Sequence, residues 1–216
     1  RKPSRSFGNQ ELGLALDGVF RGWDLSLYAA NFFNDQAHLG WHGATPVRQH
    51  ARLRMLGFAA NVATGSWLWK AEGAYLDGFR FSTAPGEQFH RLDVLVGAEF
   101  AGLTDTTISL EAVNRHLRDF DARLSGTPED GRRNDFQSAL RLTRSFLNET
   151  LKLTFLASTH GLGGGNGALQ RLQATYDVND SLVVTGGLIS YLNGEKLSFS
   201  NVGRNDRLFG ELVFHF

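Results

Sequence analysis

The chain has 216 residues with 22 basic and 22 acidic side chains, so its formal net charge is zero. Balanced charge supplies no positive field for nucleic acid, and we expect no nucleic-acid partner. The sequence has no cysteine, which excludes a disulfide framework and a thiolate metal site. No apolar run reaches the ~18 residues of a transmembrane helix, and the opening RKPSRSFGNQ lacks the apolar region of a signal peptide.

The rest of the sequence is a series of segments in which apolar and polar residues alternate. In chain order these are ELGLALDGVF, WDLSLYAANF, ARLRMLGFAANV, WLWKAEGAYL, RLDVLVGAEF, TISLEAVNRHL, FQSALRLTRSF, LKLTFLAST, LQRLQATYDV, LVVTGGLISYL and RLFGELVFHF. Alternation with a period of two predicts about eleven β-strands. No segment of similar length has the spacing of an amphipathic helix, so we predict an all-β protein.

The connections between these segments alternate between short and long. Short turns follow Phe20, Val62, Leu103, Phe146 and Val178, and long polar loops lie around residues 34–49, 82–88, 121–135, 160–167 and 193–205. This alternation is typical of an antiparallel up-and-down transmembrane β-barrel, and strands of about ten residues suit a tilted crossing of the membrane. We predict one outer-membrane domain over residues 1–216. A soluble sandwich or barrel is the alternative, but it has no reason to sort its loops by length.

Charged residues concentrate on one face of the predicted strands. A basic side chain facing lipid at mid-depth costs about 2–4 kcal/mol, so we predict that the charged face lines a wet lumen. The predicted lumen residues are Asp24, Arg52, Arg54, Lys70, Glu72, Arg91, Asp93, Glu99, Glu111, Arg115, Arg141, Lys152, Arg171, Arg207 and Glu211. Arg144 is an exception, because it alternates in phase with Leu140 and Leu142, but it lies near a turn where it could snorkel.

The last strand ends on an aromatic residue with apolar residues at alternate positions before it. These residues, Leu208, Gly210, Leu212, Phe214 and Phe216, resemble the C-terminal signal by which outer-membrane barrels are recognised. The resemblance implies the barrel-assembly machinery and outer-membrane lipid as partners.

Longer segments resemble one protein family. GSWLWKAEGAYLDGFRF, GAEFAGLTDTTISLEAVNRHLRDFD, TRSFLNETLKLTF and RNDRLFGELVFHF are similar to a proteobacterial outer-membrane family of unknown function, often encoded near inner-membrane exporters of the resistance-nodulation-division type. The resemblance implies an exporter system as a partner. Members of this family are longer, so the chain resembles a C-terminal part. The family supplies no catalytic residues.

The strand count leads to a related expectation. If Phe216 ends in the periplasm, the short turns are periplasmic and the loops at 34–47, 121–134 and 195–205 are extracellular. An odd count of about eleven strands then leaves the first residues outside, whereas bacterial barrels have even counts. We therefore expect a partial barrel, with open edges at residues 11–20 and 206–216, that does not insert alone as a stable monomer.

Other candidate chemistry is weak. His38, His42 and His50 could bind a metal but match no ligand template, and GLGGGNG lacks the Lys-Ser/Thr of a phosphate loop. Asp121, Glu129 and Asp130 could bind calcium, although a solvated loop is the simpler interpretation. Ser109 and His116 could resemble the Ser/His pair of outer-membrane hydrolases, but a separation of seven residues places them on opposite faces of a strand. We predict no metal, no cofactor and no enzyme activity.

The lumen is therefore the predicted functional surface. Opposite charges lie close in sequence, as in Lys70 with Glu72 and Glu111 with Arg115, and mixed signs predict weak ion selectivity. We expect a porin-like or exporter-associated channel for passive passage of a solute. The alternatives are a structural or docking barrel that does not transport and, third, an outer-membrane enzyme. The sequence does not identify the solute.

Overall fold

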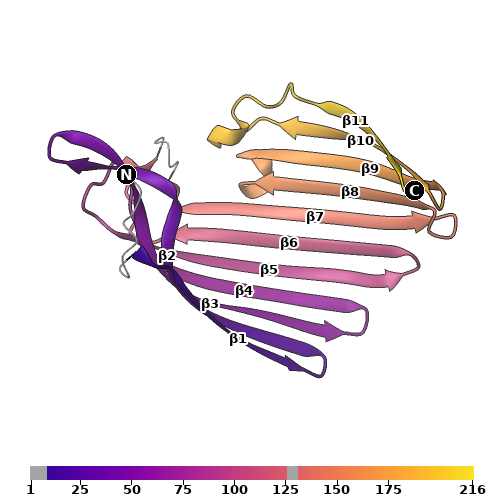
Figure 1. Cartoon of the computed structure of the whole chain (residues 1–216), viewed down its shortest axis with the longest axis horizontal. Helices are drawn as coiled ribbons and strands as arrows, with labels where there is room; N and C mark the ends of the chain where they lie inside the picture. The colour runs from indigo at the N-terminus through magenta and orange to yellow at the C-terminus, as the bar shows by residue number, and fades with distance from the viewer. Residues whose placement is uncertain (1–8, 126–130) are drawn as a thin grey trace. The chain divides into compact units, whose positions relative to one another are not determined.

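The computed structural model describes residues 9–125 and 131–216, except for the side chain of His42. In this part of the chain, eleven β-strands form one sheet in which the strands follow one another in chain order (Figure 1). Adjacent strands with a defined register, such as β7 with β8 and β8 with β9, run antiparallel. The prediction of an all-β, antiparallel up-and-down sheet is therefore confirmed.

The strands agree with the alternating segments of the sequence. Their bounds are β1 Leu12–Phe20, β2 Trp23–His42, β3 Thr45–Thr64, β4 Trp67–Phe79, β5 Phe89–Leu103, β6 Thr106–Leu117, β7 Asn134–Phe146, β8 Leu151–His160, β9 Gly167–Asn179, β10 Leu182–Leu192 and β11 Arg207–Phe214. Short 3₁₀ helices, η2 Ala122–Leu124, η3 Leu162–Gly164 and η4 Leu197–Phe199, lie in the long loops. No helix in the described part of the chain is long and apolar enough to cross a membrane.

Cross-strand pairing explains why the apolar residues of the last strands form one face. Leu172 of β9 lies opposite Phe155 of β8 and Leu188 of β10, and Leu188 lies opposite Leu208 of β11. Neighbouring side chains on one face of a sheet stabilise each pair by about 0.2–1 kcal/mol. The period of two in the sequence thus becomes a continuous apolar surface, on which Leu208 and Leu212 are exposed.

The predicted loop at residues 34–49 is wrong. The structure continues β2 to His42 and starts β3 at Thr45, so both strands have 20 residues and a tight turn at residues 43–44 joins them. At about 3.3 Å per residue, such strands are far longer than a membrane crossing requires. Polar residues on both faces hid this extension, because the period-two test depends on one face being apolar.

The chain divides into two compact units. Unit 1 comprises Arg1–Asn61, Ala71–Leu95 and Asn114–Asp135, and unit 2 comprises Val62–Lys70, Val96–Val113 and Phe136–Phe216. Unit 1 contains the cluster of buried apolar side chains, formed by Leu53, Leu76, Phe79, Phe81, Ala84, Phe89, Leu117 and Leu124. Unit 2 contains the short turns after β3, β5, β7 and β9, together with strands β8 to β11.

Gly78 changes the direction of side chains within β4. Its φ is +107°, and a Cβ at this position would overlap the carbonyl oxygen of Arg52. Only glycine adopts such a conformation without strain. The irregularity lets Phe79 join the apolar cluster beside Leu76, although the two residues are an odd number of positions apart.

The sheet has two edge strands. Among the described residues, β1 is paired with β2 and β11 with β10, and the sheet order places β1 and β11 at opposite ends. The sheet is therefore not closed, as we expected for residues 11–20 and 206–216. The last strand ends at Phe214, and the N–H of His215 adds one bond to the carbonyl of Ser181 at 2.8 Å.

Candidate functional site

The candidate site is the charged face of the sheet together with the loops that fold onto it in unit 1. Leu53, Phe89 and Leu117 belong to the buried cluster, and they come from three different strands. Phe81 and Leu124 come from loops and pack into the same cluster, where Phe81 meets Phe89 edge-on at 5.3 Å. Loops 80–88 and 118–125 therefore cover this end of the face.

The face that these loops cover carries three of the predicted lumen residues of unit 1. Arg91 and Asp93 alternate in phase with Phe89, and Arg115 alternates in phase with Leu117. Arg91 binds Asp93 through two hydrogen bonds of 2.7 and 2.8 Å, and its guanidinium lies over the ring of Phe79 at 4.5 Å. The charged groups thus border the apolar cluster.

Other polar groups of unit 1 connect strands across this face. Arg115 pairs with Asp135 at 3.7 Å. The amide of Asn61 donates to the carboxylate of Asp24 at 2.8 Å. Glu72 alternates in phase with Leu76 of the cluster. Asp135 was absent from the predicted set because it follows a polar loop, where alternation supplies no signal.

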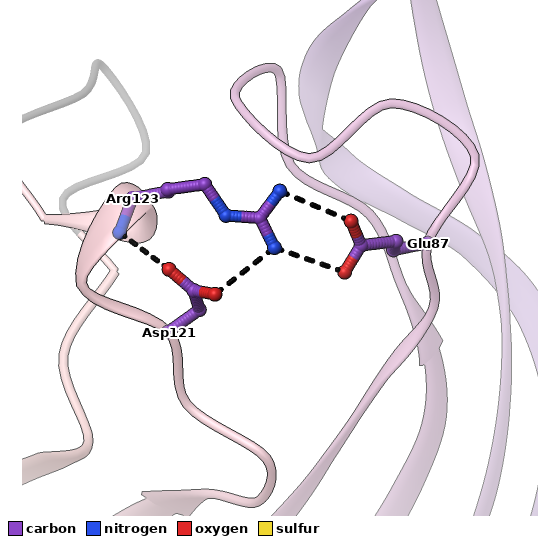
Figure 2. Close-up of polar contacts among 3 residues, drawn as sticks. All are labelled: Glu87, Asp121 and Arg123. Carbon is purple, nitrogen blue, oxygen red and sulfur yellow. Dashed lines mark hydrogen bonds and ion pairs between the residues drawn. The ribbon is translucent and has the colours of Figure 1, made fainter.

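Three charged side chains join the two covering loops (Figure 2). The guanidinium of Arg123 binds both carboxylate oxygens of Glu87, at 3.1 and 3.3 Å, and it also binds Asp121 at 3.0 Å. Asp121 caps η2 by accepting from the backbone N–H of Arg123 at 2.8 Å. We call these three residues the loop clamp. No sequence pattern indicates it, because Glu87 lies 36 positions before Arg123.

The loop clamp perturbs the acidity of its members. Hydrogen bonds from the side chain and backbone of Arg123 hold the pKa of Asp121 below its usual value. Hydrogen bonds to Asp121 and Glu87 raise the pKa of Arg123. The clamp is therefore ionic at neutral pH and includes a bidentate contact, the arrangement in which arginine binds carboxylates most specifically.

The charged residues of β4 to β6 in unit 2 also pair between strands. Lys70 binds Glu111 at 3.3 Å. The hydroxyl of Ser109 donates to Glu99 at 2.9 Å. These contacts place Lys70, Glu99 and Glu111 on one face, because Ser109 and Glu111 alternate in phase on β6.

The last strands of unit 2 align three arginines at one level. Arg141 of β7 and Arg171 of β9 both lie opposite Leu156 of β8, while Arg171 and Arg207 of β11 both lie opposite Ile189 of β10. Alternate strands are ~10 Å apart, so the guanidiniums form a row. Arg171 donates to Gln173 at 2.5 Å and lies over the ring of Phe209 at 4.9 Å.

A second level of the same face, nearer the short turns, has mixed charge. Lys152 lies opposite Thr175, Thr175 opposite Thr185, and Thr185 opposite Glu211. Arg141, Lys152, Arg171, Arg207 and Glu211 therefore share one face in unit 2. Spacing in the sequence predicted that these residues share a face. It did not predict which of them lie side by side on neighbouring strands, because that depends on the register between the strands.

Arg52 and Arg54 do not share the face of the other unit 1 residues. Leu53, which lies between them, is only 2% exposed in the buried cluster. Alternation therefore directs both arginines to the opposite side of β3, in phase with Leu56. Their contacts agree: Arg54 binds Asp77 at 2.6 Å. The sequence pattern misassigned these two arginines because the polar residues change from one face of β3 to the other towards the long loops.

The apolar face carries an aromatic cluster, together with Arg144 and the terminal motif that the sequence predicted. Trp67 stacks on Trp69 at 5.2 Å and contacts Phe100 at 4.6 Å beside the short turns. Arg144 lies over the ring of Phe146 at 4.9 Å, at the turn end of β7. The terminal motif residues Leu208, Gly210, Leu212 and Phe214 alternate in phase on β11, whereas Phe216 lies beyond the strand and is exposed.

The minor candidates form no catalytic or metal site in the described residues. Ser109 bonds to Glu99, whereas His116 contacts Asn134 at 2.9 Å, so the two are not brought together. His50 bonds to the carbonyl of Asn34 at 2.7 Å, and no group of three potential metal ligands occurs in residues 9–125 and 131–216. Glu129 and Asp130 lie outside the described residues.

Comparison with known proteins defines the class and then the family. The fold is similar to that of an anion-selective porin from Comamonas acidovorans, with a TM-score of 0.53, 12% sequence identity, and coverage of 95% of this chain and 55% of the porin chain. The chain thus has a porin-like fold and spans about half the length of that porin. The family described as "Protein of unknown function (DUF1302)" matches residues 1–196, and the chain belongs to it. No curated protein matches the chain significantly.

Proposed function

We propose that this chain forms part of the wall of an outer-membrane channel through which a solute passes passively. The observation that carries the proposal is the separation of faces: charged side chains pair between strands on one side, and leucines are exposed on the other. Such an arrangement is stable when the charged side meets water and the apolar side meets lipid. The porin-like fold supports the same location.

The row formed by Arg141, Arg171 and Arg207 gives this channel a preference for anions. Rings of basic side chains favour anions, whereas mixed signs are weakly selective. The part of the wall that carries Lys152 and Glu211 has charges of both signs, so it is polar but selects only weakly between anions and cations. The similar fold belongs to a porin described as anion-selective, which supports the same solute class.

The loops of unit 1 cover part of the charged face within that unit. Phe81 and Leu124 pack on the face that carries Arg91, and the loop clamp holds their loops together. We also propose that the chain contacts outer-membrane lipid, that its terminal motif engages the barrel-assembly machinery, and that it serves as the C-terminal part of a barrel that works with an inner-membrane exporter.

Single-channel recording tests this function. The natural protein that contains this chain would be reconstituted in a planar bilayer under a KCl gradient, and the sign of the reversal potential would report anion preference. Replacing Arg141, Arg171 and Arg207 by Gln should move the chloride-to-potassium permeability ratio towards one. Arg144→Gln, on the opposite face, should leave the ratio unchanged.

The same recordings separate the alternatives. Absence of conductance in a correctly folded protein would favour the docking barrel over the channel. Conductance with an unchanged permeability ratio in the triple variant would remove the arginine row as the source of selectivity.

A further inference from the structure

The apolar face of unit 1 contains an open hollow of about 560 Å³. Ligand sites in proteins have volumes of about 300–1,000 Å³ and are mostly apolar with a few polar groups. Four apolar residues that line the hollow are Leu12, Leu14, Ala29 and Leu56. Leu12 and Leu14 are 77% and 72% exposed, so the hollow opens directly on the surface proposed to meet lipid.

The polar groups of the hollow lie at its loop end. Asn31 follows Ala29 by two positions on β2, and Asp77 follows Tyr75 by two positions on β4, in each case towards the long loops. On β3, which runs the other way, Arg54 precedes Leu56 by two positions. One end of the hollow is therefore hydrocarbon, and the other end is polar and charged.

One basic and one acidic residue, Arg54 and Asp77, line this end of the hollow, and the carboxylate of Glu11 accepts from the N–H of Phe33 beside it at 2.7 Å. Arg54 binds Asp77 at 2.6 Å through one nitrogen, and its side chain is 73% exposed. A guanidinium has five N–H donors, so the exposed Arg54 has room for a second anion. Asp77 also faces His90 at 3.0 Å. Arg52 adds a second guanidinium, which binds Asn31 at 2.6 Å and lies over the ring of Phe33 at 4.9 Å.

The position of these arginines along the strands matches one membrane thickness. Arg54 lies ten positions before Thr64, where β3 ends at a short turn, and Asp77 lies ten positions after Trp67, where β4 begins. A tilted strand crosses the hydrocarbon in about 9–11 residues. If the short turns mark one interface, Arg54 and Asp77 lie at the other, at the level of lipid headgroups.

We propose that this hollow binds an outer-leaflet glycolipid with a phosphorylated headgroup. An acyl chain lies against Leu12, Leu14 and Leu56, and the headgroup phosphate binds Arg54 and Arg52. Arginine suits this role because its planar fork binds phosphate through paired hydrogen bonds. The proposal rests on the membrane location and orientation given under the proposed function, but it does not require that the protein conducts.

Lipid retention in nanodiscs tests the site. The natural protein would be placed in nanodiscs of zwitterionic lipid with a trace of diphosphoryl lipid A, a phosphorylated glucosamine lipid, or of its dephosphorylated form. The amount of each bound after washing would be measured by mass spectrometry. We expect the diphosphoryl lipid to be retained at least fivefold more than the dephosphorylated one, and the double variant Arg52→Gln, Arg54→Gln to lose that difference.

Matched variants keep the result decisive. Arg52→Lys with Arg54→Lys keeps the charge but loses the planar forks, so it should retain part of the preference for the diphosphoryl lipid, and this partial retention separates charge loss from misfolding. Arg144→Gln removes an arginine from the same apolar face at the short-turn end and should have no effect. Retention that is unchanged in the double glutamine variant, equal for both lipids, or lost equally in Arg144→Gln would overturn the proposal. Lack of conductance with intact lipid retention would instead overturn only the channel.

Discussion

Single residues show how the two faces exchange character along a strand. On β3, Arg54 and Leu56 share one face, while the buried Leu53 and the polar Asn61 share the other. Near the short turns, the charged side chains lie on the predicted charged face and the apolar side chains lie on the predicted apolar face. Near the loops the order reverses: Phe81 and Leu124 cover the face that carries Leu53, and the charged Arg54 is on the other face.

Leu172→Arg should destabilise the protein more than a comparable change on the opposite face. Leu172 is near the middle of β9 and its neighbours across the strands, Phe155 and Leu188, are apolar. An arginine facing lipid near mid-depth costs about 2–4 kcal/mol. Thr154→Arg, which adds the same side chain to the charged face, should cost much less. Refolding titrations into lipid vesicles would measure both, and equal losses would show that the face assignment is reversed.

Leu212→Arg provides a test of depth on the same face. Leu212 lies opposite Val184, which is only the third residue of β10 after a short turn. Close to the interface the cost of an arginine falls to about 0–1 kcal/mol. Leu212→Arg should therefore destabilise less than Leu172→Arg in the same titration, and Glu211→Gln should be mild. A larger loss at Leu212 would place the membrane differently along β11.

At the scale of elements, the sequence predicted the strands well and the connections less well. Alternation placed β7, β8 and β9 within a few residues because each has one apolar face. It failed between residues 34 and 49, where β2 and β3 carry polar residues on both faces. It also could not find the loop clamp or the arginine row, because both depend on which distant residues the register and loop packing bring together.

Arg123→Ala should loosen the two covering loops. The variant removes the contacts to Glu87 and Asp121 that join loop 80–88 to loop 118–125. The backbone N–H groups of Leu124 and Ser125, which bond to Asp121 and Ala122 within the loop, should exchange with deuterium faster. Arg204→Ala, in a loop of unit 2, is the control and should leave these amides unchanged. Unchanged exchange in Arg123→Ala would show that the apolar cluster alone holds the loops.

The loop clamp should weaken in acid. Because the pKa of Asp121 is lowered in the folded protein, its contribution is complete above the unfolded value of about 4 and is lost as the pH falls through the lower folded value. The protection of the Leu124 amide, which is its exchange rate relative to the unfolded chain at the same pH, should therefore fall below about pH 4 in the native protein. In Asp121→Asn this loss of protection should be smaller. An equal loss in the variant would assign the effect to other groups.

At the scale of the whole molecule, the sequence was sufficient for the fold class. Alternating strands and alternating loop lengths predicted an up-and-down sheet, and the order β1 to β11 confirms it. The family adds no activity, because it is described only as a protein of unknown function.

Cysteine labelling on intact cells tests the proposed orientation. The chain has no cysteine, so each introduced thiol is the only one in this sequence. Thr83→Cys, in an exposed loop between β4 and β5, should react with an impermeant reagent. Asp180→Cys, in the short turn between β9 and β10, should react only after the outer membrane is permeabilised. The opposite pattern would invert the topology.

The central claim is that the charged face meets water and the apolar face meets lipid within the same strand. Thr175 and Ala174 are neighbours on β9 whose side chains point to opposite faces, Thr175 opposite Lys152 and Ala174 opposite Leu153. With the protein in lipid bilayers, the thiol of Thr175→Cys should react rapidly with a charged methanethiosulfonate, and the thiol of Ala174→Cys should be protected. Protection of Thr175→Cys together with rapid reaction of Ala174→Cys, or equal rates for both, would contradict a wet lumen on the charged face.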